Sequence, residues 1–128
     1  MSITVIDYGS GNLRSAAKAL EAAANNINLN SKIEITSDPK KIIQSDKIVL
    51  PGQGSFRDCY LGIKKIPELN ETLNEFVLEK KNPILGICVG MQLFAKTGYE
   101  SQETKGFGWI DAEVRKINNM DKKLKLPH

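Results

Sequence analysis

The chain has 128 residues, of which 41% are hydrophobic and 26% are charged, a composition typical of a globular domain and not of a disordered chain. Its net charge of +3 comes from lysines spread along the sequence, so the concentrated basic face of a nucleic-acid-binding protein is absent. Without a bilayer-length apolar run, a signal-peptide pattern or a disulfide framework, we expect one cytoplasmic domain that does not cross a membrane.

The first half of the chain alternates between strand and helix patterns. Residues 2–6 have the pattern of a short buried strand, which a turn-rich loop over 7–12 follows. Apolar residues then recur at helical spacing from Leu13 to Ala24. Alternation over 32–36 predicts a second strand, and residues 37–39 open a short helical turn. A third strand at 48–50 ends at a Pro-Gly-Gln-Gly sequence.

The second half continues the alternation. An apolar face over residues 69–80 predicts a helix, which Asn82-Pro83 closes. A fourth strand is expected at 84–87, a helix at 90–96 and a further strand at 113–117. Alternating strands and helices indicate an α/β fold with three layers and a mostly parallel open sheet.

The loops that follow three of these strands are expected to meet. They cover residues 7–12, residues 51–56 and the turn at Cys88. In an open parallel sheet, ligands bind beyond the carboxyl ends of the strands. The sequence therefore places a candidate site where these loops converge.

Cys88 lies between Gly86 and Gly90, where a strand pattern gives way to a helix pattern. This arrangement is typical of a nucleophile elbow, a sharp turn that exposes a reactive side chain and directs helix amides at the reacting centre. A buried structural cysteine in a glycine-rich turn is the alternative reading of the same five residues.

Two other kinds of site are disfavoured. The Gly-x-Gly of residues 7–12 lacks the third glycine of a dinucleotide-binding loop, because Arg14 occupies that position. One histidine and two separated cysteines do not supply a metal-binding cluster. We therefore expect no metal and no cofactor.

With these motifs assembled, the chain resembles the class I glutamine amidotransferases, and among them the glutaminase subunits of imidazole glycerol phosphate synthase, an enzyme of histidine biosynthesis. The matching segments run from the N-terminal loop to the last residues, and they are 7–13, 50–56, 86–93, 105–108 and 125–128. The resemblance implies hydrolysis of glutamine to glutamate and ammonia, without a cofactor. It also implies a heterodimer with a cyclase subunit that consumes the ammonia.

The resemblance assigns roles to individual positions. Cys88 is expected to be the nucleophile that forms a glutamyl thioester, with oxyanion-hole amides from Val89 and from the segment around Gly52 and Gln53. Gln92 is expected to hold the amino-acid end of the substrate, with Gly52 and Gln53 also in contact with it. Asn12 and Gly54 are expected to lie toward the cyclase interface and to take part in gating, whereas Cys59 is expected to be a packed helical cysteine.

The histidine and glutamate that complete the family's catalytic triad have no counterpart here. The single histidine, His128, falls in a segment that matches a different turn of the family. We therefore expect residues 1–128 to be the N-terminal part of one amidotransferase domain and to be inactive alone. Two alternatives stay open, namely a paralogue that supplies ammonia for surface-sugar biosynthesis and a non-catalytic binding remnant.

Overall fold

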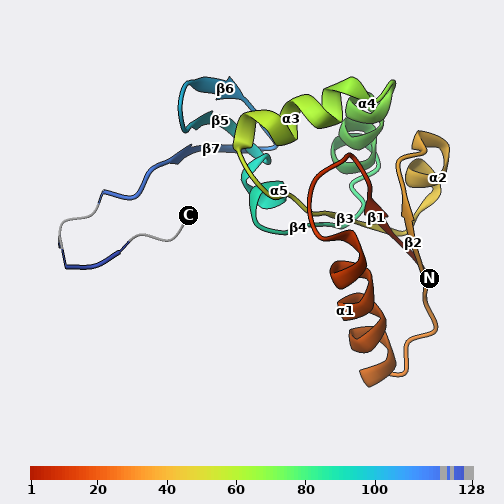
Figure 1. Cartoon of the computed structure of the whole chain (residues 1–128). Helices are drawn as coiled ribbons and strands as arrows, with labels where there is room; N and C mark the ends of the chain where they lie inside the picture. Colours follow the sequence, from red (N-terminus) through yellow and green to blue (C-terminus); the bar gives the residue numbers. More distant parts are fainter. Residues whose placement is uncertain (119–120, 122, 126–128) are drawn as a thin grey trace.

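The computed structural model describes residues 1–118, 121 and 123–125 and has a parallel four-stranded sheet at its centre. The strand order is β2-β1-β3-β4 (Figure 1), with β1 at Ser2–Ile6, β2 at Lys32–Thr36, β3 at Lys47–Leu50 and β4 at Ile84–Gly86. All three pairings are parallel. The four strands predicted from residues 2–87 are therefore confirmed.

Helices cover both faces of this sheet (Figure 1), which confirms the three-layer α/β prediction. Ile3 and Val5 of β1 pack against α1 (Leu13–Asn26) on one face. Ile6 packs into a larger core on the other face, beneath α2 (Pro39–Gln44), α3 (Phe56–Lys65) and α4 (Leu69–Asn74). The alternation of side chains along a strand produces this division.

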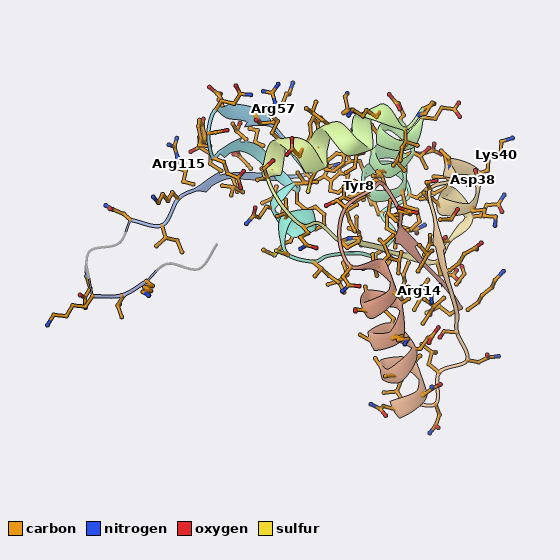
Figure 2. The ribbon with its side chains drawn as sticks, in the orientation of Figure 1. Tyr8, Arg14, Asp38, Lys40, Arg57 and Arg115 are labelled. Atoms are coloured by element: carbon orange, nitrogen blue, oxygen red, sulfur yellow. The ribbon has the colours of Figure 1, made fainter. Side chains whose placement is uncertain are left out.

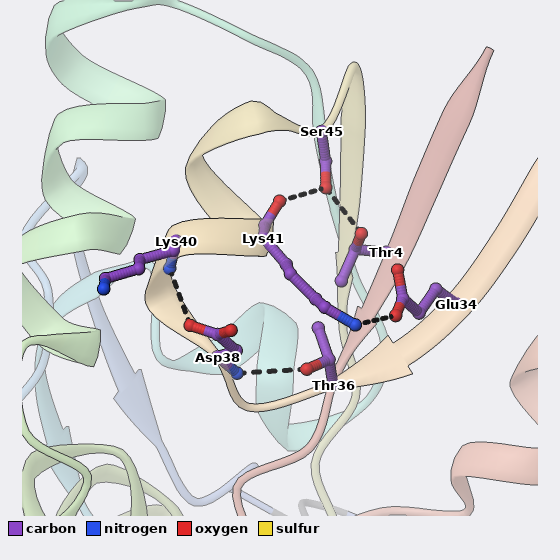
Figure 3. A network of polar contacts seen from close by, with 7 residues as sticks. All are labelled: Thr4, Glu34, Thr36, Asp38, Lys40, Lys41 and Ser45. Atoms are coloured by element: carbon purple, nitrogen blue, oxygen red, sulfur yellow. Dashed lines mark hydrogen bonds and ion pairs between the residues drawn. The ribbon is translucent and has the colours of Figure 1, made fainter.

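Short polar side chains cap the first three helices, with Asn12 at α1, Asp38 at α2 and Ser55 at α3. Asp38 caps α2 by accepting a 3.0 Å hydrogen bond from the Lys40 amide, and Pro39 occupies the first helical turn (Figure 3). At the end of the same helix, the Ser45 hydroxyl pairs with the Thr4 hydroxyl of β1 at 2.5 Å. The two buried hydroxyls satisfy one another and connect α2 to the sheet.

The helix predicted over residues 69–80 is present in two parts. α4 continues without a break into a π-helical turn, η1 (Glu75–Glu79). Leu69, Leu73 and Phe76 are fully buried along this helix. Its apolar face, recognised from spacing alone, forms much of the core above the sheet.

The helix predicted over residues 90–96 is wrong beyond its first turn. α5 covers only Val89–Gln92, and β5 (Ala95–Tyr99) begins soon afterwards. It lies between β6 (Glu103–Lys105) and β7 (Ile110–Arg115) in a second sheet. A Cβ at Gly98 would come within 2.6 Å of the Phe56 ring, so the glycine lets this strand lie directly on α3.

The last predicted strand, at residues 113–117, begins three residues earlier, as β7. Residues 126–128, with His128 and most of the final matching segment, lie outside the described part of the chain. Among the described residues, no helix combines the length and the apolar character that a bilayer crossing requires.

Candidate active site

The turn after β4 has the backbone of a nucleophile elbow. Cys88 adopts φ 55° and ψ −123°, precedes the first residue of α5 and has an exposed side chain. A non-glycine residue with positive φ is strained by about 1–3 kcal/mol and persists only where its surroundings enforce it. The cysteine is therefore held in an exposed and strained position, which argues against the buried structural reading.

The glycines on either side of Cys88 enforce this turn. A Cβ at Gly90 would overlap the Leu50 carbonyl at the end of β3, and one at Gly86 would overlap the backbone of Met91. Both obstacles are backbone atoms, which cannot move aside as a flexible side chain can. The elbow is therefore packed so closely against the sheet that these positions accept only glycine.

Most of the backbone amides that follow Cys88 are engaged within the turn. Gly90 donates to Ile87 O at 3.0 Å, and Met91 donates to Cys88 O at 3.0 Å. No described residue accepts a hydrogen bond from the amide of Val89, the first residue of α5. An amide of this kind beside a nucleophile can donate to an oxyanion.

Hydrogen bonds join the three loops that the sequence predicts to converge. The Tyr8 hydroxyl, in the loop between β1 and α1 (Figure 2), donates to the Pro51 carbonyl after β3. In the same pair of loops, the backbone N–H of Gln53 donates to the Ser10 hydroxyl at 2.9 Å. The Ile87 amide of the elbow donates to Leu50 O at 3.0 Å. The predicted convergence is confirmed.

Tyr8 is a buried donor in this arrangement. It is 5% exposed and packs beneath α3, where a Cβ at Gly62 would lie 3.1 Å from the Tyr8 carbonyl oxygen. Burial is the main cause that raises the pKa of the phenol above its ordinary value, with the nearby Cys59 adding to the rise. The phenol therefore stays protonated, and it remains able to donate to Pro51, across the neutral range.

An open pocket of about 420 Å³ lies beside Cys88 at this edge. The three converging loops and the start of α1 line it, through Gly11, Asn12, Ser15, Ala16, Pro51, Gly52, Gln53, Ile87 and Cys88. The structure thus brings four of the predicted site residues together, namely Cys88, Gly52, Gln53 and Asn12.

The other predicted residues lie around this pocket. Val89 is buried directly after Cys88. Gln92 is half-buried on α5, and its backbone N–H donates to Cys88 O at 3.2 Å. Gly54 is exposed with φ 97°. Neither Gln92 nor Gly54 is among the described residues that line the pocket. Asn12 also caps α1, since its side chain accepts from the Ser15 amide at 3.3 Å.

Cys59 is the buried cysteine of α3, as expected. It is 1% exposed and packs in the main core, while its sulfur lies 3.3 Å from the Ser10 hydroxyl. Tyr8 and Ser10 are site residues to which the sequence analysis gave no role. Both belong to the quoted motif of residues 7–13, but their hydrogen bonds cross to another loop and leave no signal in local spacing. Across the described residues, no group of three His, Cys, Asp or Glu side chains is arranged to hold a metal ion.

Comparison with known proteins agrees with this geometry. Residues 4–126 match the family glutamine amidotransferase class-I. The chain is 53% identical over 129 residues to the imidazole glycerol phosphate synthase subunit HisH of Pelagibacter ubique, covering all of this chain and 60% of the relative. It is 49% identical to the protein of the same name from Bradyrhizobium diazoefficiens and 47% identical to that from Brucella suis, covering 100% and 99% of this chain and 59% of each relative. The chain thus spans about three fifths of the length of these curated relatives, and it belongs to the class I glutamine amidotransferase family.

Proposed function

We propose that this chain carries the nucleophile of the glutaminase subunit of an imidazole glycerol phosphate synthase. The observation that carries the proposal is the exposed Cys88, held at φ 55° beside a pocket that three strand-end loops form. The names of its relatives supply the enzyme, imidazole glycerol phosphate synthase, and its division into subunits. The pathway, histidine biosynthesis, is what the family resemblance implies.

In the proposed reaction, the Cys88 thiolate attacks the side-chain amide carbon of glutamine. The carbonyl π electrons move to oxygen, and collapse of the tetrahedral intermediate breaks the C–N bond as the nitrogen takes up a proton and leaves as ammonia. Water then attacks the thioester carbonyl carbon, the C–S bond breaks, and glutamate is released as the Cys88 thiol is regenerated. The exposed position of the sulfur gives substrate access to it.

Backbone amides would stabilise the negative oxygen of the intermediate. We assign one donor to Val89 N–H, whose amide has no acceptor among the described residues, and a second to the segment around Gly52 and Gln53, which lines the same pocket. Removing one such donor costs about 2.7–4 kcal/mol of barrier in a comparable hydrolase. Gln92, one turn along α5, is proposed to hold the amino-acid end of glutamine.

The reaction also needs a general base and a group that orients it, as in other triad enzymes. The chain's one histidine, His128, lies outside the described residues, and we assign the base to no described residue. We propose that residues 1–128 correspond to the N-terminal part of a single amidotransferase domain, in line with the coverage of about three fifths of its relatives. The remainder of that domain would supply the histidine and the glutamate.

The proposed partner is the cyclase subunit of the synthase, in a heterodimer. Ammonia released into neutral water is mostly protonated and loses its nucleophilicity, so a closed passage between subunits preserves it for the second reaction. Asn12 and Gly54 lie at the loop edge around the pocket, and we propose that this edge faces the cyclase.

Covalent labelling of the full-length subunit in complex with its cyclase tests the proposal. A diazo-ketone analogue of glutamine should modify Cys88, and peptide mass spectrometry should find Cys59 unmodified. Excess glutamine should protect Cys88 from this reagent, whereas it should protect much less against a small general alkylating agent, which reports exposure alone.

The Cys59→Ala variant serves as the matched control, because it should label as the wild type does. Labelling of Cys59, or labelling of Cys88 that glutamine does not slow, would contradict the assignment of Cys88 as the glutamine-binding nucleophile. It would favour the non-catalytic alternative.

A further inference from the structure

Residues 106–110 overlap one of the segments that match the family, but the proposed reaction gives them no role. They lie against the end of α5, the helix that begins at the elbow. Their amides donate to carbonyls at that end, from Phe107 to Leu93 O at 2.9 Å and from Ile110 to Phe94 O at 2.9 Å. A helix of four residues has too few internal hydrogen bonds to hold its own position. This segment therefore fixes the end of α5 that lies away from the elbow.

Trp109 is the side chain of this segment that is itself fixed from two sides. Its indole N–H donates to Asn74 Oδ1 at 2.8 Å, and Asn74 Nδ2 donates to the Asn70 carbonyl within α4 at 3.0 Å. The indole ring stacks on Phe107, with 4.2 Å between the ring centroids and 10° between the ring planes. The hydrogen bond and the stack together set where the ring lies relative to the core beneath α4.

The ring of Trp109 is connected to the elbow through Phe94. The centroids of these two rings are 5.2 Å apart. Phe94 also lies against Gly86, because a Cβ at Gly86 would come within 2.7 Å of Phe94 Cζ. Gly86 is the last residue of β4, two residues before Cys88. A path of direct contacts thus runs from α4 through Trp109 and Phe94 to the backbone that holds the nucleophile.

We propose that Trp109 is a positioning residue, which holds Cys88 in its strained conformation through the indole bond to Asn74 and the ring contact with Phe94. The inference rests on the proposed glutaminase function. A non-glycine residue with positive φ persists only where its surroundings enforce it, and Trp109 belongs to those surroundings. Trp109 is not among the described residues that line the pocket beside Cys88. Its loss should therefore lower kcat and leave the KM for glutamine nearly unchanged.

The test replaces Trp109 in the full-length subunit and measures glutamine hydrolysis in complex with the cyclase. Trp109→Phe keeps an aromatic ring in the stack and removes the indole N–H. Its kcat should fall by roughly 2- to 12-fold, the factor that corresponds to one net hydrogen bond. Trp109→Ala removes the ring as well, and its kcat should fall by up to about 100-fold, the effect of misplacing a reacting group by about 1 Å.

A double-mutant cycle with Asn74 tests whether the indole bond carries the effect. Asn74→Leu removes the acceptor of the same bond and should lower kcat as Trp109→Phe does. The double variant should be no slower than Asn74→Leu alone, since the two changes break one interaction. Asn74→Asp keeps an oxygen acceptor for the indole and should stay closer to the wild-type kcat than Asn74→Leu.

Ser45→Ala is the matched control for a general loss of stability. It removes one hydroxyl of the buried pair that Ser45 forms with Thr4 of β1, two strands away from β4 (Figure 3). Like Trp109→Phe, it breaks a single hydrogen bond between side chains. It should lower the free energy of unfolding and leave kcat unchanged.

Covalent labelling of Cys88 gives a readout that needs no turnover. Both Trp109 variants should react more slowly than the wild type with the diazo-ketone analogue of glutamine, because that reagent must meet a correctly held sulfur. A small general alkylating agent should react at the wild-type rate, since Cys88 stays exposed. The ratio of the two labelling rates therefore separates a misplaced sulfur from a less accessible one.

The outcomes distinguish the two proposals. An active wild type whose Trp109 variants match it in kcat and in analogue labelling would overturn the positioning role alone. A rise in KM without a fall in kcat, or equal slowing with both reagents, would also overturn it. A wild-type complex that neither hydrolyses glutamine nor reacts with the analogue would overturn the proposed function.

Discussion

The elbow at Cys88 and the segment from Pro51 to Gly54 lie against each other, but different forces fix them. At the elbow, added atoms would strike backbone, as at Gly90 against the Leu50 carbonyl. In the segment after β3, Gly52 also packs against the elbow, but Pro51 and Gln53 are held by the side-chain hydroxyls of Tyr8 and Ser10. Steric packing has no alternative arrangement of similar energy, whereas a single hydrogen bond is worth only about 0.5–1.5 kcal/mol net. The nucleophile is therefore fixed by packing, whereas Pro51 and Gln53 depend on individual hydrogen bonds.

The same contrast has a functional reading under the proposed glutaminase activity. A nucleophile gains from a permanent position, because misplacement slows every turnover. An oxyanion donor that engages only at the right time can couple hydrolysis to a partner's state, and such coupling needs an element with two arrangements. Under the proposed function, the strained turn would fix the nucleophile and the hydrogen-bonded loop would carry the second oxyanion donor.

The largest effect is expected at Gly90, where a side chain would break the fixed region. Gly90→Ala should lower the free energy of unfolding by about 3 kcal/mol, the upper end of overpacking costs, since its neighbours are backbone atoms. Gly9→Ala is the comparison, because its φ is 88° but nothing lies within 4 Å of a Cβ there. That variant should lose about 1–2 kcal/mol from its backbone conformation alone. Urea unfolding measures both, and a Gly90→Ala loss no larger than that of Gly9→Ala would contradict steric fixation of the elbow.

A smaller effect is expected at Tyr8, which anchors the hydrogen-bonded segment. Tyr8→Phe should cost about 1–3 kcal/mol, because it leaves the buried Pro51 carbonyl without its donor. It should also change the dependence of stability on pH. Because burial raises the pKa of the folded phenol, the unfolded chain ionises first, near pH 10, and wild-type stability falls as the pH rises above that value.

The variant carries no phenol at this position, so urea midpoints measured between about pH 9 and pH 11 should fall less steeply for Tyr8→Phe than for the wild type. The remaining tyrosines and the lysines titrate in both proteins and cancel in the comparison. Parallel pH profiles would show that the Tyr8 hydroxyl is not a buried donor, and the anchor of the segment would have to be sought elsewhere.

Local sequence patterns were sufficient for the parts of the fold that repeat a simple period. The strands of the central sheet are short apolar runs that end in turn residues, and the elbow is marked by glycines flanking Cys88. The helix predicted over 90–96 extends into β5 at Ala95 and Lys96, because Ala95–Tyr99 has no clear alternation and its strand conformation comes from pairing with β6 and β7. Pairing with distant segments overrides weak local preference.

The candidate site divides in the same way. Cys88, Gly52, Gln53 and Asn12 could be placed at one edge because strand order in an α/β fold brings loop ends together. The holding role of Ser10 could not be predicted, because it depends on a contact with Gln53, 43 residues away. Hydrogen bonds between loops follow from the packed structure and not from the spacing of either loop.

Trapping the covalent intermediate tests the central claim most directly. The full-length subunit, in complex with its cyclase and the cyclase's substrate, is mixed with glutamine and quenched in acid within one turnover. Peptide mass spectrometry should find a glutamyl thioester on Cys88, absent from Cys88→Ala and present in Cys59→Ala. Turnover of glutamine with no adduct at Cys88, or with an adduct on another residue, would contradict the account.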